Sequence, residues 1–468
     1  MAPRRVGVWD AAARLAAFTM VSAVLLWGVL LSPPLTGLRR ALGLPEVLPG
    51  GRFNPATHMF SVEPSNPNLY FARLTHYYHA LFACLLFATI VAAAAPPLLE
   101  LREGFRRGAL VLGFLGALWT SCGGLLYAYY ARLPWLHGLF IAGLAMLYAA
   151  GVLAASSIKP RDWLDAGVLA AIVLLLVGGA IGGFVGSSFI DHSVRAGLVR
   201  ALSLARLNPD LAESNPYWRA VVGHEHAMIA IADSVALILV LKCLGVRWSR
   251  GRRAAAVLAV AGLIVMAVAS FLVWPYGGVA HEAITPASLV LLLCLTLLLA
   301  RTMKQGDMVH RSARVAAVIG VLTVWGAVVV PGAIVAMSLH HPTPFIHPAF
   351  RSPYWRVAEN AFNIGHWHIL LAAWGLGVFT AAMATEPRGG RLRDLAASAA
   401  LLLAAMGFAA ASFAADLYML CSGPKPTPTT SPWMPWIEAG LVVMTLGVAT
   451  AYMVVLYDTA RTILNRRA

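Results

Sequence analysis

The chain has 468 residues, of which 60% are hydrophobic and only 12% are charged. A soluble domain carries about a quarter charged residues, so this composition excludes that class and predicts an integral membrane protein. The formal net charge of +15 does not indicate a nucleic-acid partner, because the basic residues gather in short connections between apolar segments.

Twelve apolar segments are long enough to cross a bilayer. In chain order they are residues 11–33, 71–95, 108–131, 135–156, 166–190, 220–243, 254–275, 284–301, 312–338, 361–384, 394–415 and 435–459. The first is too long for a signal peptide and lacks a small-residue cleavage site, so we expect it to remain as a helix. Arginines in alternate connections and at the C-terminus predict a multi-pass protein of the cell membrane, in contact with lipid and with both termini cytoplasmic.

The twelve segments divide into three groups of four, over residues of about 1–160, 161–305 and 306–468. In each group the second segment follows a proline-aromatic-arginine element, which begins at Pro67, Pro216 and Pro353, and then carries histidines. A pattern that returns at near-regular intervals indicates an internal repeat. We therefore predict an all-α fold of twelve transmembrane helices in three quasi-equivalent four-helix arcs, forming one integral-membrane domain.

Histidines within these apolar segments are the strongest functional signal, because an imidazole in hydrocarbon is costly. They form three clusters: His76 and His79, His224 and His226, and His366 and His368. Residues two apart point to nearly opposite sides of a helix, so His366 and His368 can bind two different groups. His76 and His79 share one face, so one can ligate haem iron while the other donates a hydrogen bond. The alternative for such pairs is a hydrogen-bonded core.

A second metal site is predicted beside the haem ligands. His224 and His226 also point to opposite sides of their helix. His281 follows the seventh segment at the same membrane depth, so the sixth, seventh and tenth segments can converge on one pocket. Two imidazoles with a carboxylate from Glu282 or Glu225 would suit non-haem copper or iron.

Asp233 is the one acidic residue deep in the sixth segment, about 13 Å beyond His224 along a helix. An acidic residue within a membrane segment predicts a proton path. The alternative is a polar residue that is hydrogen-bonded internally. Five cysteines stand singly, without a Cys-x-x-Cys pair, so no zinc, iron–sulfur or copper-thiolate site is expected.

The motif Asn360-Ala-Phe-Asn-Ile-Gly-His366-Trp-His368 resembles the tenth helix of the catalytic subunit of the heme-copper oxidase superfamily, especially its B-type members. Residues 217–224, 272–282 and 75–82 are similar to the sixth, seventh and second helices of that family, and the resemblance covers nearly the whole chain. It implies a high-spin haem on His366 and a low-spin haem on His368 with a histidine of the second helix. It also implies an active-site metal on His224 and His281.

Departures from the family pattern bear on the substrate. The family has two adjacent histidines where this chain has Ala280-His281, and its active-site tyrosine is replaced by Met228. Nitric oxide reductases of the superfamily lack that tyrosine and add carboxylates beside the metal, which Glu282 and Glu225 resemble.

Two arginines are expected at the haem edges. The paired arginines that usually hold haem propionates are missing, and Arg219 and Arg356 lie at the outer ends of the ligand helices instead. Their alternative role is to extend toward the interface. His226 could replace the missing ligand if its helix is distorted, and otherwise has a supporting role.

The sequence therefore predicts a membrane reductase with two haems and a non-haem iron or copper, which reduces nitric oxide to nitrous oxide. One alternative is a divergent oxygen reductase with another radical donor, such as Tyr276. Others are a non-catalytic two-haem electron-transfer subunit and a transporter without haem. Because no donor motif is present, electrons must come from a quinol or from a cytochrome or cupredoxin-type subunit.

Overall fold

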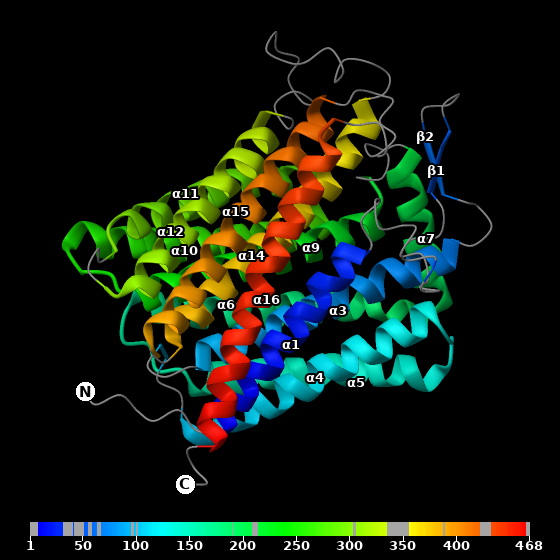
Figure 1. Ribbon diagram of the computed structural model, residues 1–468. Helices are drawn as coiled ribbons and strands as arrows, with labels where there is room; N and C mark the ends of the chain where they lie inside the picture. The colour runs from blue at the N-terminus through cyan, green and yellow to red at the C-terminus, as the bar shows by residue number, and fades with distance from the viewer. Residues whose placement is uncertain are drawn as a thin grey trace.

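The computed structural model describes residues 8–30, 41, 51–54, 59–62, 67–94, 98–99, 102–189, 191–207, 214–302, 306–334, 355–386, 389–421 and 432–464. Nearly all of this backbone is helical, and the long helices lie side by side in one bundle (Figure 1). The all-α prediction is confirmed for these residues, apart from one short hairpin.

The helices are given in chain order. They are α1 (Val8–Leu30), α3 (Pro67–Ala94), α4 (Glu103–Tyr129), α5 (Pro134–Ser157), α6 (Trp163–Gly186), α7 (His192–Leu207), α9 (Pro216–Leu244), α10 (Arg250–Tyr276), α11 (Gly278–Ala300), α12 (Met308–Val324), α14 (Trp355–Thr385), α15 (Arg391–Cys421) and α16 (Met434–Leu464). A 3-10 turn (Ser187–Phe189) follows α6, and a π-helical turn (Trp325–Val329) follows α12. Strands β1 (Gly51–Asn54) and β2 (Met59–Val62) form an antiparallel hairpin before α3.

Eleven helices of the described chain are long and apolar enough to cross a membrane, which is typical of a multi-pass membrane protein. They include every long helix from α3 to α16, whereas α7 has only 16 residues. The first predicted segment corresponds to α1, which has 23 residues. Side chains 24–30 of α1 lie outside the described part of the chain, so α1 is not among the eleven.

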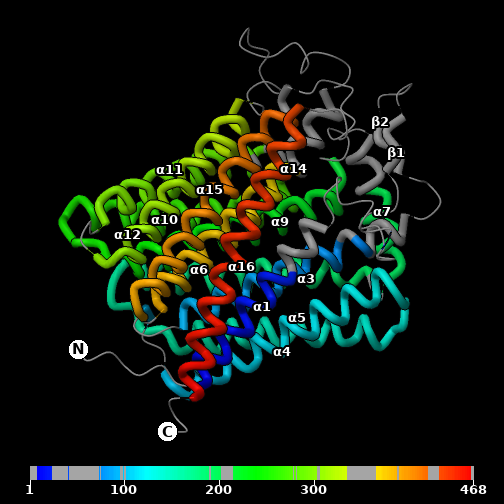
Figure 2. Tube along the Cα trace, viewed as in Figure 1, coloured from blue at the N-terminus to red at the C-terminus, as the bar shows by residue number. Residues whose placement is uncertain are grey.

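Three helices, α3, α9 and α14, contact one another at the centre of the bundle. Each is covered by helices close to it in sequence: α1 and α4 on α3, α6 and α10 on α9, and α12 and α15 on α14. The Cα trace shows α4 and α5 along one edge of the bundle and α10 to α12 along the opposite edge (Figure 2). Largely buried faces of the central helices therefore meet where the sequence concentrates its histidines.

The two ends of the bundle differ. The hairpin and α7 lie at the end where α3 begins, which we call the hairpin end (Figure 1). The start of α1 and the end of α16 meet at the other end, which we call the terminal end. Buried ion pairs tie the helices together there: Arg14–Glu386 at 3.1 Å, Arg393–Asp458, Arg106–Asp10, and Lys242–Asp165. Pairing is required because an isolated charge in such surroundings is strongly unfavourable.

One sequence-based boundary is wrong. His281 does not belong to the helix of the seventh segment but lies in the first turn of α11, because Gly277 separates α10 from α11. Gly277 has φ of 65°, a left-handed conformation that favours glycine and ends α10. His192 is the first residue of α7, a helix that packs on α9.

Candidate functional site: a layer of histidines between the central helices

The three central helices carry their histidines to a common layer nearer the hairpin end. Pro216 is the first residue of α9, a position that proline favours, and the Asn215 side chain accepts a hydrogen bond from the Tyr217 N–H. His224 and His226 follow two and three turns into this helix. Each of the three interfaces between the central helices contains ring side chains in contact.

Between α9 and α14 the ring contact is His226 with Trp367. His366 lies on the same interface, within electrostatic range of His226. The Nδ1–H of His226 donates to the Val222 carbonyl at 2.9 Å, and Trp367 meets the His226 ring edge-on, with centroids 6.4 Å apart. The ring of His366 also lies against Gly332, after the π-helical turn.

Between α14 and α3 the pair is His368 and Tyr78. The Tyr78 hydroxyl lies 3.2 Å from Nε2 of His368, and the ring centroids are 5.8 Å apart. His368 is exposed although the next residue, Ile369, is buried. The imidazole is therefore accessible to a ligand, but its neighbour on α3 is a phenol and not His76 or His79.

Between α3 and α9 the pair is His79 and His224. Their rings are nearly parallel, with an interplanar angle of 17° and centroids 6.3 Å apart. The Nδ1–H of His79 donates to the Thr75 carbonyl at 2.7 Å, and that of His224 donates to the Gly178 carbonyl of α6 at 3.0 Å. Because a carbonyl only accepts, the proton is on Nδ1 in both neutral rings, and Nε2 keeps its lone pair for a metal.

Ring contacts thus occur at all three interfaces. His79 of α3 stacks on His224 of α9, His226 of α9 meets Trp367 of α14, and His368 of α14 lies beside Tyr78 of α3. The two histidines of α9 and the two of α14 thus serve different interfaces, as their two-residue spacing predicts.

His76 is directed away from these interfaces. Its Nε2 lies 3.0 Å from Nδ1 of His137 on α5, and both residues are buried. Tyr127 and Phe140 pack against the same pair. His137 was missed from the sequence because it stands alone near the start of its segment, although a histidine beside an apolar run was a usable signal.

Buried carboxyl groups accompany the histidines. Oε2 of Glu225 and Oδ2 of Asp233, both on α9, are buried without a hydrogen-bond partner among the described residues. Oδ1 of Asp416 on α15 is also buried without a hydrogen-bond partner among the described residues. The sequence analysis did not single out Asp416, because this residue falls just past the end of the predicted segment 394–415. Unpaired buried carboxyl oxygens are uncommon and are candidates for proton handling.

The remaining candidates lie elsewhere. Glu282 is exposed on α11, so it does not join the buried group that contains Glu225. Arg219 lies against Gly277 at the junction of α10 and α11, and its buried Nε has no described partner. The side chains of His281 and Arg356 lie outside the described part of the chain.

No protein-family model matches this sequence, and no curated protein matches it significantly. The site is therefore interpreted from its own residues. Among the side chains that the structure describes, histidine, cysteine and acidic residues do not form a group of three or more that could hold a metal ion.

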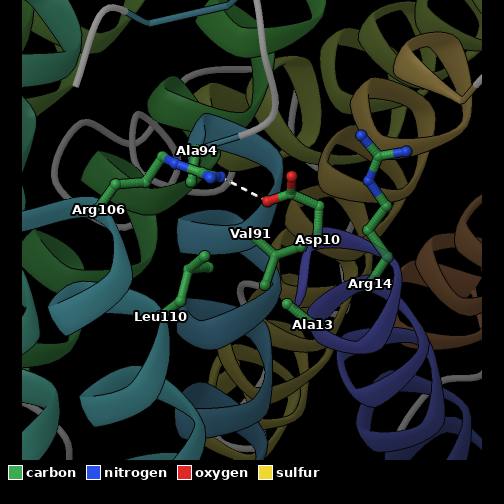
Figure 3. Close-up of a pocket in the computed structure, with 7 residues that line it drawn as sticks. All are labelled: Asp10, Ala13, Arg14, Val91, Ala94, Arg106 and Leu110. Carbon is green, nitrogen blue, oxygen red and sulfur yellow. Dashed lines mark hydrogen bonds and ion pairs between the residues drawn. The ribbon is translucent and has the colours of Figure 1, made fainter. Parts of the chain in front are cut away.

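A small cavity at the terminal end is not a substrate site. It has a volume of about 10 Å³, enough for one water molecule at most, and Arg106 points across it to Asp10 at 2.5 Å (Figure 3). Val91 and Ala94 of α3 line it, roughly 18 Å along the helix from His79. It lies within the buried ion pairs and is separate from the histidine layer.

Proposed function

We propose that this protein is a haem-containing membrane oxidoreductase of the heme-copper oxidase type, which reduces nitric oxide to nitrous oxide. The gathering of histidines at all three interfaces between α3, α9 and α14 is the single observation that carries this proposal. Imidazoles whose Nδ1–H is held by a carbonyl are oriented for metal binding through Nε2. With α1 as a twelfth span, the helices would form three four-helix arcs, with both termini on the cytoplasmic side of the cell membrane.

The residues fit iron ligation at two interfaces. His366 would hold the high-spin haem and His368 the low-spin haem. The Tyr78 hydroxyl, 3.2 Å from Nε2 of His368, would lie beside the second group. His226 would hold the non-haem iron or copper, because it is the described imidazole beside His366.

Glu225 and Asp233 would supply protons. Reduction of two nitric oxide molecules by two electrons and two protons gives nitrous oxide and water, and the bound metals would bind the substrate and supply the electrons. Glu225 adjoins His226 in sequence, and Asp233 lies about 12 Å further along α9. Their buried oxygens without described partners can take up a proton and release it toward the pocket.

Electrons would come from a quinol or from a cytochrome or cupredoxin-type donor. Cys84, Cys122, Cys243 and Cys294 are free thiols on separate helices, so these residues offer no copper-thiolate relay. A second candidate is a two-haem electron-transfer subunit, because the described histidine, cysteine and acidic side chains form no group of three that could hold a separate metal ion. The oxygen-reductase alternative gains no support from Tyr276, because its side chain is 68% exposed.

An optical spectrum with metal analysis of the purified chain tests this proposal. We expect haem, an additional non-haem metal, and consumption of nitric oxide by the reduced protein. Two haems without further metal and without turnover would establish the electron-transfer subunit. Consumption of oxygen but not nitric oxide would show that the substrate is oxygen. A protein without haem would refute the whole proposal.

A further inference from the structure

Seven arginines at the terminal end form no ion pair with any acidic side chain of the described residues. They lie beside the connection between α9 and α10 and the one between α11 and α12: Arg247, Arg250, Arg252, Arg253, Arg301, Arg311 and Arg314. Other cations at this end, such as Arg106 and Arg393, are paired with carboxylates. The unbalanced positive charge is therefore local to these two connections.

A backbone contact joins the two connections. Val246 and Thr302 form an antiparallel bridge, and its register places the next residue, Arg247, opposite Arg301. Arg314 of α12 donates from Nε to the Thr302 hydroxyl at 3.0 Å, so the start of α12 is held against the same bridge. The two connections thus form one surface. We call its five exposed arginines the arginine patch: Arg247, Arg250, Arg253, Arg301 and Arg311.

Within the chain this accumulation of charge is unfavourable. Like charges directly opposite each other on paired strands are destabilising, and Arg250 and Arg253 share one face of α10 at its positive end. Between residues 234 and 358 the only acidic residues are Glu282, near the start of α11, and Asp307. Asp307 already accepts hydrogen bonds from α12. A balancing negative charge from outside the chain would therefore stabilise the patch.

The patch lies where the bundle would leave the membrane. It occupies the ends of α9, α10, α11 and α12, four helices that are long and apolar enough to span a bilayer. Trp248, next to Arg247, is half-buried, and tryptophan is enriched where a membrane meets water. About one turn from the patch, Leu258 of α10 and Leu297 of α11 are 52% and 53% exposed. A ligand here meets cations with its polar end and apolar side chains with the rest.

We propose that the arginine patch binds the phosphate groups of anionic phospholipids in the leaflet at the terminal end. A guanidinium group binds phosphate oxygens through two parallel hydrogen bonds, and a cluster of about four to eight basic residues beside a spanning helix is typical of such lipid sites. An acidic protein segment would match the charge alone, whereas a phospholipid also covers the exposed leucines. The inference requires no haem and goes beyond the proposed function.

Native mass spectrometry of the purified protein in detergent, titrated with phosphatidylglycerol or with phosphatidylcholine, tests the inference. The parent should bind phosphatidylglycerol more tightly. Arg247→Gln/Arg301→Gln should weaken this binding about 25-fold and leave phosphatidylcholine unaffected, since each arginine contributes about fivefold. Arg107→Gln/Arg391→Gln is the matched control, because both arginines are exposed at the same end but lie outside the patch. The control should bind both lipids as the parent does.

Equal affinities of the parent for the two lipids would overturn the inference, and so would equal losses in the two double variants. If the patch variant instead loses an acidic polypeptide that copurifies with the parent, and its lipid selectivity is unchanged, the partner is a protein and the inference is wrong.

The unfolding temperature gives a second measurement, which also shows whether each variant folds. Phosphatidylglycerol should raise the unfolding temperature of the parent and of the control more than that of the patch variant. An equal rise in all three proteins would contradict lipid binding at the patch. Haem content should be the same in all three, so this inference and the proposed function fail separately.

Discussion

Lys242 on α9 forms an ion pair with Asp165 on α6, and both side chains are almost completely buried, at 7% and 1% exposure. Arg161 adds a second contact to the same carboxylate at 3.3 Å. This pair fixes the terminal end of α9 against α6, the helix whose Gly178 carbonyl holds His224. The position of one histidine thus depends on an electrostatic contact far along the same two helices.

Lys242→Met should destabilise the protein by about 3–5 kcal/mol, because it leaves the Asp165 charge buried with only the half-exposed Arg161 beside it. Unfolding monitored by circular dichroism in detergent measures the change. The double variant Lys242→Met/Asp165→Leu should recover most of the loss, since both charges are then removed. A double variant as unstable as the single one would show that packing, and not charge, is responsible.

Glu225→Gln should lower the rate of nitric oxide reduction by about 10²- to 10⁴-fold, the usual contribution of a positioned proton donor. Because glutamine preserves the shape of the side chain, the haem spectrum should stay unchanged. Turnover with an artificial reductant and the optical spectrum are the two measurements.

Glu282→Gln provides the matched control for this experiment. Glu282 is exposed on α11 while Oε2 of Glu225 is buried, so the control should keep most of the parent activity. Equal losses in the two variants would mean that the exposed carboxylate also serves the reaction, as the sequence-based hypothesis held. Unchanged turnover in Glu225→Gln would remove Glu225 from the proton path.

Tyr78→Phe should alter the spectrum of the haem on His368, because it removes the hydroxyl that lies 3.2 Å from Nε2. Tyr77→Phe is the matched control, since Tyr77 packs against Tyr78 but forms no described hydrogen bond with the histidine. Resonance Raman and optical spectra of both variants distinguish the two outcomes. A spectrum unaffected by Tyr78→Phe would separate this phenol from the haem site.

Apolar segments and their lengths predicted the membrane helices well, because hydrocarbon imposes one strong constraint on a spanning helix. The opposite directions of His224 and His226 also followed from helix geometry. The partner of His79 could not be predicted, since it depends on which helices become neighbours. His281 was assigned to the wrong helix because nothing in the apolar pattern marks the positive φ of Gly277.

A buried carboxyl at the terminal end makes stability depend on pH. Burial raises the pKa of Glu386 above its ordinary value of 4.5, although Arg14 lies 3.1 Å away. A raised pKa in the folded state means that the folded protein holds its proton more tightly than the unfolded chain does. The contribution of this group to stability is therefore complete below about pH 4.5 and is lost as the pH rises through the raised pKa.

Glu386→Gln mimics the protonated carboxyl at every pH and should remove this dependence. The unfolding temperature of the parent should fall relative to that of Glu386→Gln as the pH rises above about 4.5. This difference should level off once the carboxyl is ionised. Asp458 and Arg393 remain in both proteins, so the comparison isolates the Glu386 carboxyl. Parallel pH profiles for the two proteins would show that Glu386 is already ionised in the fold and that Arg14 outweighs the cost of burial.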